Sequence, residues 1–321
     1  MSKDALSPEK LFEHVQDATY FHFPQFFDSF FPGSHKGHVP LPQPLAKPVL
    51  DAAGNPVMGH HGAVYEAVWA PHTGNQLVDT TIQPLDLVFT KFMAIELMVA
   101  IICVVLFTWL GMSLRSGKAP RGLLPNLLEV FLVFIRDQIA RPAIGKHDAD
   151  RYLPFLWTVF FFVLGCNLFG MLPWMGSPTG ALAVTGVLAL TTFGIVLTSG
   201  MQQMGVIGFL KAQVPHMDLP KPIAIVLVPM IFVIEIFGLL VKHGVLAIRL
   251  LANMMAGHIV LAVVIGFIAA TSGQLVWWLV TPASLAGATA LSLLELFVAF
   301  LQAYIFTFLS ALFIGASLHA H

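Results

Sequence analysis

Long apolar runs, separated by short polar segments, dominate the chain from about residue 85 onward. Because about 20 residues of helix cross the hydrocarbon of a bilayer, these runs predict membrane-embedded helices. The last two runs are far longer than one perpendicular crossing needs, so each must tilt strongly, bend or break. The predicted helices cover Leu87–Leu114, Pro154–Trp174, Ala181–Met201, Ile223–Ala270 and Leu285–Leu318.

One further segment, Pro125–Ile144, has a different pattern. Its apolar residues recur at helical spacing, but Glu129, Arg136, Asp137 and Arg141 interrupt them. This pattern is typical of an amphipathic helix that lies in the membrane interface rather than crossing it. The expected fold class is therefore an all-α integral membrane protein, with about five embedded helical segments and one interfacial helix.

The first 84 residues contain Pro and Gly clusters and no apolar run long enough to span a bilayer. A short amphipathic helix is expected near Pro8–Asp17, and the aromatic run Tyr20–Phe31 suits a membrane interface. The first 17 residues lack the apolar core of a signal peptide. We expect residues 1–84 to be an extramembrane region, mostly loop with a short helix, and residues 85–321 to be the membrane domain.

Composition and charge narrow the function classes. Hydrophobic residues make up 57% of the 321 residues and charged residues 10%, and only seven charged side chains lie beyond Tyr152. Such a stretch cannot present a surface to water, which excludes a soluble enzyme, a nucleic-acid-binding protein and a disulfide-stapled secreted domain. Cys103 and Cys166 lie in apolar runs and are interpreted as small core residues.

The basic residues predict the orientation. They gather after the first apolar run and again before the fourth, so both segments are expected to face the cytoplasm. The N-terminus is then outside and the C-terminus inside. The residues are Arg115, Lys118, Arg121, Arg136, Arg141, Lys146 and Arg151, followed by Lys211 and Lys221.

Charged and amide side chains inside the last two apolar runs form two stripes. Glu235, Lys242 and Arg249 are spaced by seven, and a heptad step drifts only about 20° around a helix. Asn253 stays on the same stripe. By the same reasoning, the last run carries its own stripe, made of Glu295 and Gln302. Charges in a membrane segment are costly, so these stripes indicate an aqueous path or a buried ionic network.

Alternative interpretations remain open for part of the first stripe. Glu235 and Lys242 also fit a helix-stabilising pair, and Lys242 could extend toward an interface. Arg249 is different because arginine stays charged and the residues around it are apolar. A permanent charge there is useful only if an anionic group meets it.

The stretch from Arg249 to His258, RLLANMMAGH, resembles the signature R-L-x-x-N-x-x-A-G-(H or E) of subunit a of F-type ATP synthases. Glu295 with the later LQAYIF resembles the family's last helix, and NLFGMLP at 167–173 resembles its preceding hairpin. The resemblance covers roughly residues 85–318. It implies that the two over-long segments run as a tilted hairpin along a ring of c subunits.

The resemblance also implies roles for the polar residues. Arg249 would face the c-ring carboxylate and separate two offset half-channels for protons, with Gln302 beside it. Glu295, Asn253 and His258 would line the outer path. Some family members carry an acid at the His258 position and a histidine at the Glu295 position, so here the pair is exchanged. Glu235 and Lys242 are candidates for the inner path. A buried His258–Glu295 hydrogen bond that only locks the hairpin is the plainer interpretation.

The implied partners are the c-subunit ring, the b-subunit peripheral stalk, the other subunits of the complex and the lipid bilayer. No cofactor, nucleic acid or catalytic site of the chain's own is expected, and the implied location is a bacterial inner membrane.

Two other classes of function compete with this one: a stand-alone secondary transporter or ion channel in which Arg249 binds an anion, and a purely structural subunit. Transporters often show internal repeats, and none is found here. Scattered loop histidines do not predict a metal site: His35, His38, His60, His61 and His72.

Overall fold

The computed structural model divides into two compact units. The first unit comprises Met1–Val99, Leu168–Pro178 and Gly257–Ser292, and the second comprises Ala100–Asn167, Thr179–Ala256 and Leu293–His321. The structure describes residues 17–18, 20–22, 38–43, 46–50, 57–59, 62–63, 65–67, 89–114, 122–172, 175–213 and 221–318.

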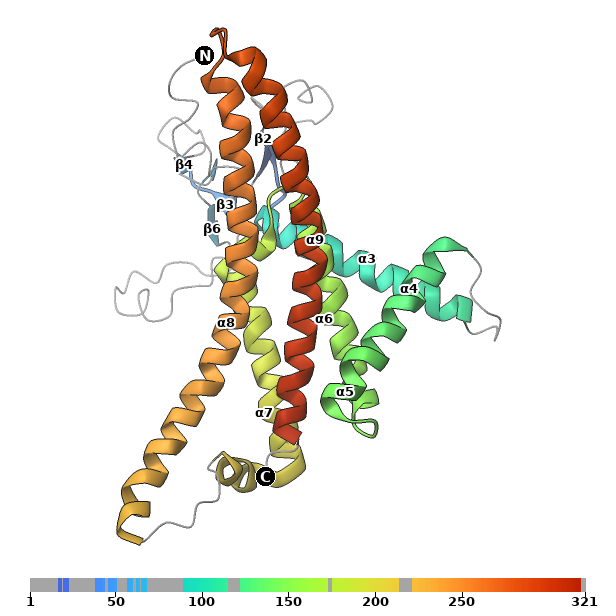
Figure 1. Cartoon of the computed structure of the whole chain (residues 1–321), viewed down its shortest axis with the longest axis vertical. Coiled ribbons are helices and arrows are strands. Elements are labelled where there is room, and N and C mark those ends of the chain that lie inside the picture. Colours follow the sequence, from blue (N-terminus) through green and yellow to red (C-terminus); the bar gives the residue numbers. More distant parts are fainter. Residues whose placement is uncertain are drawn as a thin grey trace. The chain divides into compact units, whose positions relative to one another are not determined.

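Helices dominate the described residues, and five of them are long and apolar enough to cross a membrane (Figure 1). The expected all-α membrane class and the number of embedded segments are therefore confirmed. These five helices are α3 (Lys91–Leu114), α6 (Ala149–Gly170), α7 (Leu182–Ala212), α8 (Lys221–Ala270) and α9 (Trp277–Leu318).

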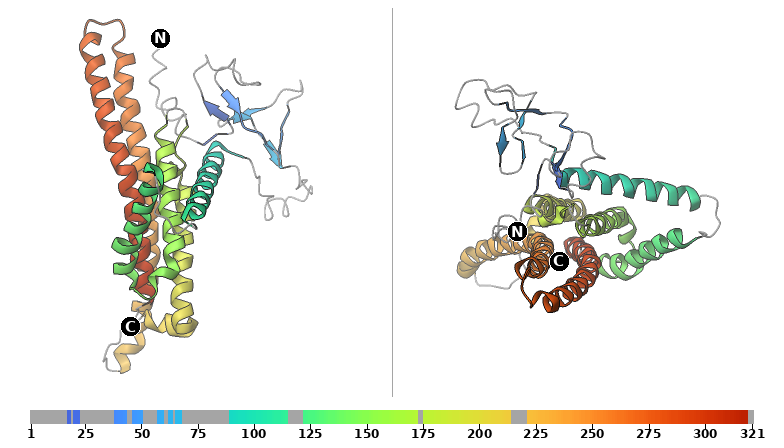
Figure 2. Two further views of the ribbon diagram at one scale, coloured as in Figure 1. Left: turned by 90° about the vertical axis from the view of Figure 1, so that its right-hand side faces the viewer. Right: turned by 90° about the horizontal axis from the view of Figure 1, so that it is seen from above.

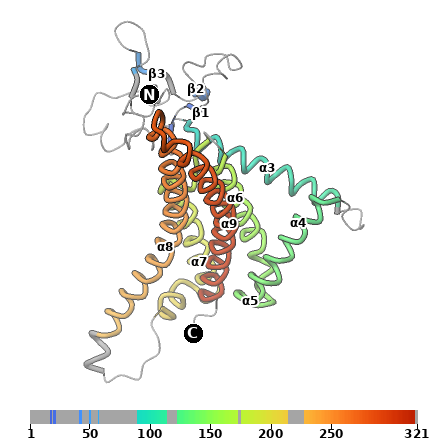
Figure 3. Tube along the Cα trace, turned by 45° about the horizontal axis from the view of Figure 1, so that its top comes forward, coloured from blue at the N-terminus to red at the C-terminus, as the bar shows by residue number. Residues whose placement is uncertain are grey.

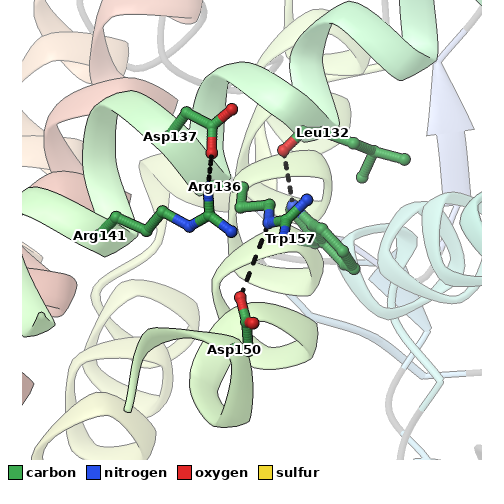
Figure 4. Close-up of polar contacts among 6 residues, drawn as sticks. All are labelled: Leu132, Arg136, Asp137, Arg141, Asp150 and Trp157. Carbon is green, nitrogen blue, oxygen red and sulfur yellow. Dashed lines mark hydrogen bonds and ion pairs between the residues drawn. The ribbon is translucent and has the colours of Figure 1, made fainter. Parts of the chain in front are cut away.

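The predicted interfacial segment is one helical run made of three parts (Figure 3). α4 (Leu123–Phe134) continues into η3 (Ile135–Ala140), a π-helix, and then into α5 (Arg141–Ile144). The wider π turn carries two ion pairs, from Arg141 to Asp137 at 2.7 Å and from Arg136 to Asp150 at 3.6 Å (Figure 4). A π-helix is rare and has no signal in this sequence, so its presence was not predicted.

The N-terminal region contains short antiparallel strand pairs that the sequence did not predict. β1 (Tyr20–His22) pairs with β2 (His38–Pro40), β3 (Ala46–Pro48) with β6 (Tyr65–Ala67), and β4 (Met58–Gly59) with β5 (Gly62–Ala63). Residues 8–16 of the predicted helix and most of the aromatic run at 20–31 lie outside the described residues.

Two N-terminal side chains hold the start of α3. The Asp17 carboxylate accepts a hydrogen bond from the backbone N–H of Phe92 at 3.2 Å, which satisfies one of the free donors of the first helical turn. The side-chain amide of Gln43 makes two bonds of 2.7 Å to the backbone of Phe89. These bonds explain why the helix begins at Lys91, four residues after its predicted start.

The two middle spans differ from prediction at their ends. α6 begins at Ala149 and ends at Gly170, where a turn with Gly176 at φ 76° leads to η4 (Pro178–Gly180). α7 continues past its predicted end through Ala212, but Gly205 has φ 74° and ψ 163° inside it. After this glycine the chain leaves the axis of the preceding helix.

Replacing Gly205 with valine is expected to destabilise the protein by about 1–3 kcal/mol, because this backbone region is almost closed to residues with a Cβ. The measurement is thermal unfolding of the purified protein in detergent. Gly194→Val in the same helix is the matched control, since a Cβ there meets no atom within 4 Å and needs no unusual backbone. Equal unfolding temperatures for the two variants would contradict the prediction.

The two longest helices are continuous. α8 has 50 residues and α9 has 42, so at about 1.5 Å per residue they measure roughly 75 and 63 Å. The sequence left open whether these two long segments tilt, bend or break, and their continuity excludes a break. In the first unit a turn at 271–276 joins the end of α8 to the start of α9, with Gly273 at φ 85° (Figure 2).

The core of the second unit forms around one face of α9. Phe300 stacks on Phe131 of α4 with ring centroids 6.4 Å apart, and the Ser317 hydroxyl donates to the carbonyl of Val196 in α7 at 2.7 Å. Near its end, α9 approaches α5 so closely that a Cβ on Gly315 would overlap the carbonyl oxygen of Ala143. This packing fixes the rotation of α9 and hence the direction of its polar side chains.

Candidate functional site

The predicted polar stripe of α8 is present on the helix. Glu235, Lys242, Arg249 and Asn253 all lie within the continuous α8. Lys242 Nζ is 3.9 Å from Glu235 Oε1, and their side chains are 52% and 45% exposed. An exposed ion pair at this distance contributes little to the free energy of folding. The pair therefore places charge along α8 without stabilising the fold appreciably.

The buried side of α8 lies on a different face from this stripe. In the second unit, five of its residues are buried and follow helical spacing: His243, Leu246, Ala247, Leu250 and Met254. At about 100° per residue these five cluster around one direction, and the polar stripe lies about 80–120° away from it. The stripe therefore runs along the flank of α8, beside the seam that packs on the rest of the unit.

Arg249 has no counter-ion among the residues that the structure describes. Its side chain is partly buried, and no hydrogen bond or ion pair joins it to a described residue. A guanidinium stays charged, and a charge in an apolar setting costs several kcal/mol unless it is paired. Arg249 is therefore a cation on an accessible flank of a membrane helix, without a counter-ion in the described part of the chain.

Glu295 and Gln302 lie on the packed face of α9. Their exposed fractions are 8% and 5%, and Ala299 and Ala303 on the same face are fully buried. Their location on one face agrees with the sequence interpretation. Glu295 Oε1 is buried and has no hydrogen-bond partner within the described part of the chain. A carboxyl oxygen left in this state is costly, so this oxygen does not add to the stability of the described fold.

Asn167 was not predicted from the sequence as a site residue. Its side chain is fully buried, donates to the carbonyl of Ala299 at 3.3 Å and accepts from the Thr179 hydroxyl at 2.7 Å. Ala299 lies between Glu295 and Gln302 along α9, so Asn167 ties α6 to α9 at the centre of the polar face. An amide inside an apolar span was the signal that could have found it.

His243 is a second residue that was missed. Its ring lies between Phe193 of α7 and Phe313 of α9, with centroid distances of 5.1 and 4.9 Å. Nδ1 is 2.9 Å from the carbonyl oxygen of Leu239 and so donates to it, whereas Nε2 is buried without a partner among the described residues. His243 is the polar member of the α8 seam and helps to fix which way Arg249 points.

His258 belongs to the first unit, near the end of α8. Its Nε2 is buried without a hydrogen-bond partner in the described ranges. Glu295 belongs to the second unit, so their pairing stays a prediction. No group of three potential metal ligands occurs within the described residues, and four of the five loop histidines lie outside them.

The chain is similar to known proteins over most of the membrane domain. The family model described as ATP synthase A chain matches residues 93–315. "ATP synthase subunit a" of Myxococcus xanthus (strain DK1622) is 44% identical over 234 residues, covering 73% of this chain and 74% of that protein.

Two further relatives carry the same name. That of Anaeromyxobacter dehalogenans (strain 2CP-1 / ATCC BAA-258) is 44% identical over 64% of this chain and 52% of its own length. That of Chloroherpeton thalassium (strain ATCC 35110 / GB-78) is 43% identical over 63% of this chain and 57% of its own length. The chain thus matches between about half and three quarters of the length of these relatives. Because the family model covers well over half of the chain, and the Myxococcus relative extends the match to 73% of it, the chain belongs to the ATP synthase A chain family.

Proposed function

We propose that this chain is the proton-translocating stator subunit of an F-type ATP synthase. In this proposal the chain offers two offset half-channels to the carboxylates of a rotating c-ring, and Arg249 separates them. The observation that carries the proposal is Arg249 on the flank of α8, beside the packed seam and without a counter-ion among the described residues. A permanent cation in this position suits a passing carboxylate that belongs to another subunit.

The electrostatics of a mid-membrane carboxyl group drive the mechanism. Facing lipid, the group is protonated, because the ionised form costs several kcal/mol in an apolar medium. Beside the Arg249 guanidinium the ionised form is favoured, so the proton leaves into one half-channel. After passing Arg249 the carboxylate reloads from the other half-channel. The fixed positive charge also repels protons that would pass directly between the two paths.

The remaining polar residues divide between the two paths. Glu295, Asn253 and His258 serve the outer path, with Gln302 beside the passing carboxylate. The buried, unpaired oxygen of Glu295 supports this role, since it remains able to accept a proton or a water hydrogen bond. Glu235 and Lys242 line the inner path, and their half-exposed side chains favour a water-accessible opening of that path.

The partners and location follow from the proposed function. The chain would assemble with a c-subunit ring, a b-subunit peripheral stalk and the rest of the complex in a bacterial inner membrane. Lys211 lies at the end of α7 and Lys221 at the start of α8. By the positive-inside rule, they support a cytoplasmic location for the connection between these two helices, with the N-terminus outside. ATP would be made or hydrolysed on other subunits, and this chain would supply no catalytic site.

Glu295→Gln tests the proposal directly. The variant is expected to slow proton flux through the complex by at least about tenfold, because a positioned proton-transfer group is lost while its size is kept. The measurement is ATP-driven acidification of membrane vesicles, together with the amount of complex assembled. Glu129→Gln in α4 makes the same chemical change outside the proposed paths and is the control. Unchanged flux in Glu295→Gln would contradict the role of Glu295, and unchanged flux with a complex that lacks this chain would contradict the whole proposal.

A further inference from the structure

A cavity of about 750 Å³ lies in the second unit between α3, α4 and α6. Its lining is mainly apolar and aromatic, and Phe107 of α3 packs edge-on against Phe161 of α6 at 4.8 Å. None of the residues proposed for the proton paths lines it. Representative lining residues are Cys103, Phe107, Gly111, Leu132, Trp157 and Phe161.

The polar groups of this lining are mostly used within the chain. The Trp157 indole N–H donates to the carbonyl of Leu132 at 3.2 Å, and the Thr158 hydroxyl donates to the carbonyl of Pro154 at 2.7 Å. An occupant with polar atoms would find few partners, whereas a hydrocarbon chain needs none. Because α3 and α6 are both apolar enough to cross a membrane, lipid hydrocarbon is available at the depth of the cavity.

The size of the cavity distinguishes among apolar occupants. A membrane helix about 10 Å across and 30 Å long fills roughly 2,000 Å³ or more. The cavity therefore holds much less than a helix of a partner subunit, but its volume is within the range of about 300–1,000 Å³ that is usual for small-molecule sites. A flexible acyl chain fits inside this volume, whereas a partner helix would only lie across its open side.

A cation lies next to one wall of the cavity. Arg136 is one turn beyond Leu132, whose carbonyl holds Trp157, and Figure 4 shows these side chains together. Arg136 Nε is 3.6 Å from Asp150, which is too long for a hydrogen bond, and the Arg136 side chain is 42% exposed. The neighbouring Arg141 is instead engaged by Asp137 at 2.7 Å. Arg136 thus keeps most of its five N–H donors for an external anion.

We propose that the α3–α4–α6 cavity is a phospholipid site, in which an acyl chain fills the cavity and the phosphate of the headgroup binds Arg136. The apolar lining and the adjacent guanidinium together match the two halves of such a lipid, since arginine is well suited to bind phosphate. The site is separate from the proton paths, so it does not depend on the proposed function.

Photo-crosslinking tests the proposal on the full chain, purified from membranes with the subunits that accompany it. The probe is phosphatidylglycerol with a diazirine in one acyl chain, supplied in phosphatidylcholine nanodiscs. We expect adducts on the cavity residues of α3 and α6 several-fold above those on the exposed face of α7, for example at Val187 and Leu190. Equal labelling of both surfaces would overturn the proposal. So would adducts on a helix of a partner subunit in place of adducts on the cavity residues.

Two variants sharpen the test. Gly111 lines the cavity and a Cβ there meets no atom within 4 Å, so Gly111→Phe should fill the space and lower cavity adducts at least about fivefold. Gly194→Phe on α7 is the matched control and should leave them unchanged. Arg136→Gln should retain the acyl chain but abolish the preference of the cavity for the phosphatidylglycerol probe over an uncharged diacylglycerol probe with the same diazirine chain. Cavity adducts that persist in Gly111→Phe would overturn the site; if that variant does not fold, the adduct map of the unmodified chain decides.

Discussion

Replacing Arg249 with alanine or glutamine is expected to abolish ATP-driven proton pumping while the protein still assembles in the membrane. In the proposed function, Arg249 is the fixed cation that stabilises the ionised carboxylate of a passing c subunit. Leaving one partner of a buried ion pair without the other costs about 3–5 kcal/mol. Added to a barrier, this corresponds to a loss of roughly 100-fold or more in rate.

Assembly should survive because the partly buried Arg249 makes no hydrogen bond or ion pair with the described residues. No described residue pairs with it, and the seam of α8 is made by other side chains, from His243 to Met254. Removing an unpaired charge from an apolar helix should, if anything, ease insertion. The test therefore separates the two effects: pumping is lost while the amount of assembled complex is kept.

The measurement combines acidification of inverted vesicles with quantification of the assembled complex. Ile248→Ala is the control, because Ile248 is the adjacent residue, is 57% exposed and carries no charge. It should pump normally. Normal pumping by Arg249→Ala would rule out the rotary role, and failure of both variants to assemble would show instead that this part of α8 is needed for packing.

The sequence was sufficient to predict which segments form the membrane helices, because the hydrophobicity that defines each helix is summed over its whole length. The fourth apolar run was predicted as Ile223–Ala270 and the helix spans Lys221–Ala270. The polar stripe of α8 was also predictable, since heptad spacing places side chains on one face of any continuous helix. These features depend only on hydrophobicity and helical geometry.

Features set by tertiary contacts were not predictable in the same way. The extension of α7 to Ala212 depends on Gly205, whose positive φ lets the chain turn within an otherwise helical pattern. The π-helix at Ile135–Ala140 and the bonds of Gln43 to Phe89 have no periodic signal. A hydrophobicity pattern does not identify a positive φ, a π turn or a bond between residues distant in sequence.

The site shows the same division. The positions of Arg249, Glu295 and Gln302 along their helices followed from the sequence. The seam of α8, on which the direction of Arg249 depends, required the structure, because its four apolar residues do not differ from other membrane residues and only packing shows that His243 lies with them. Asn167 had a sequence signal, an amide inside an apolar span, but its link to α9 required the structure, which shows its bond to Ala299.

Gly315→Val is expected to have the largest effect on stability, because Gly315 lies where α9 packs closely against the backbone of α5. A Cβ at this position would overlap the carbonyl oxygen of Ala143 and would lie 2.9 Å from its carbonyl carbon and 3.3 Å from Cα of Ile144. These are backbone atoms, which cannot rotate away as a side chain can. Overpacking usually costs about 1–3 kcal/mol, and a clash of the new side chain with fixed backbone atoms should reach or exceed the upper end.

Relief of this clash requires α9 to move away from α5, and that movement would disturb the contacts which align its polar face. The Ser317 hydroxyl would lose its bond to Val196, and Phe313 would leave the ring of His243. We therefore expect little folded protein, measured as the yield and thermal stability of the purified complex, with proton pumping lost in proportion. Gly186→Val on α7, where a Cβ meets no atom within 4 Å, should keep the normal yield. Normal yield and stability in Gly315→Val would show that α9 is not held by α5, and the buried positions of Glu295 and Gln302 would then need another support.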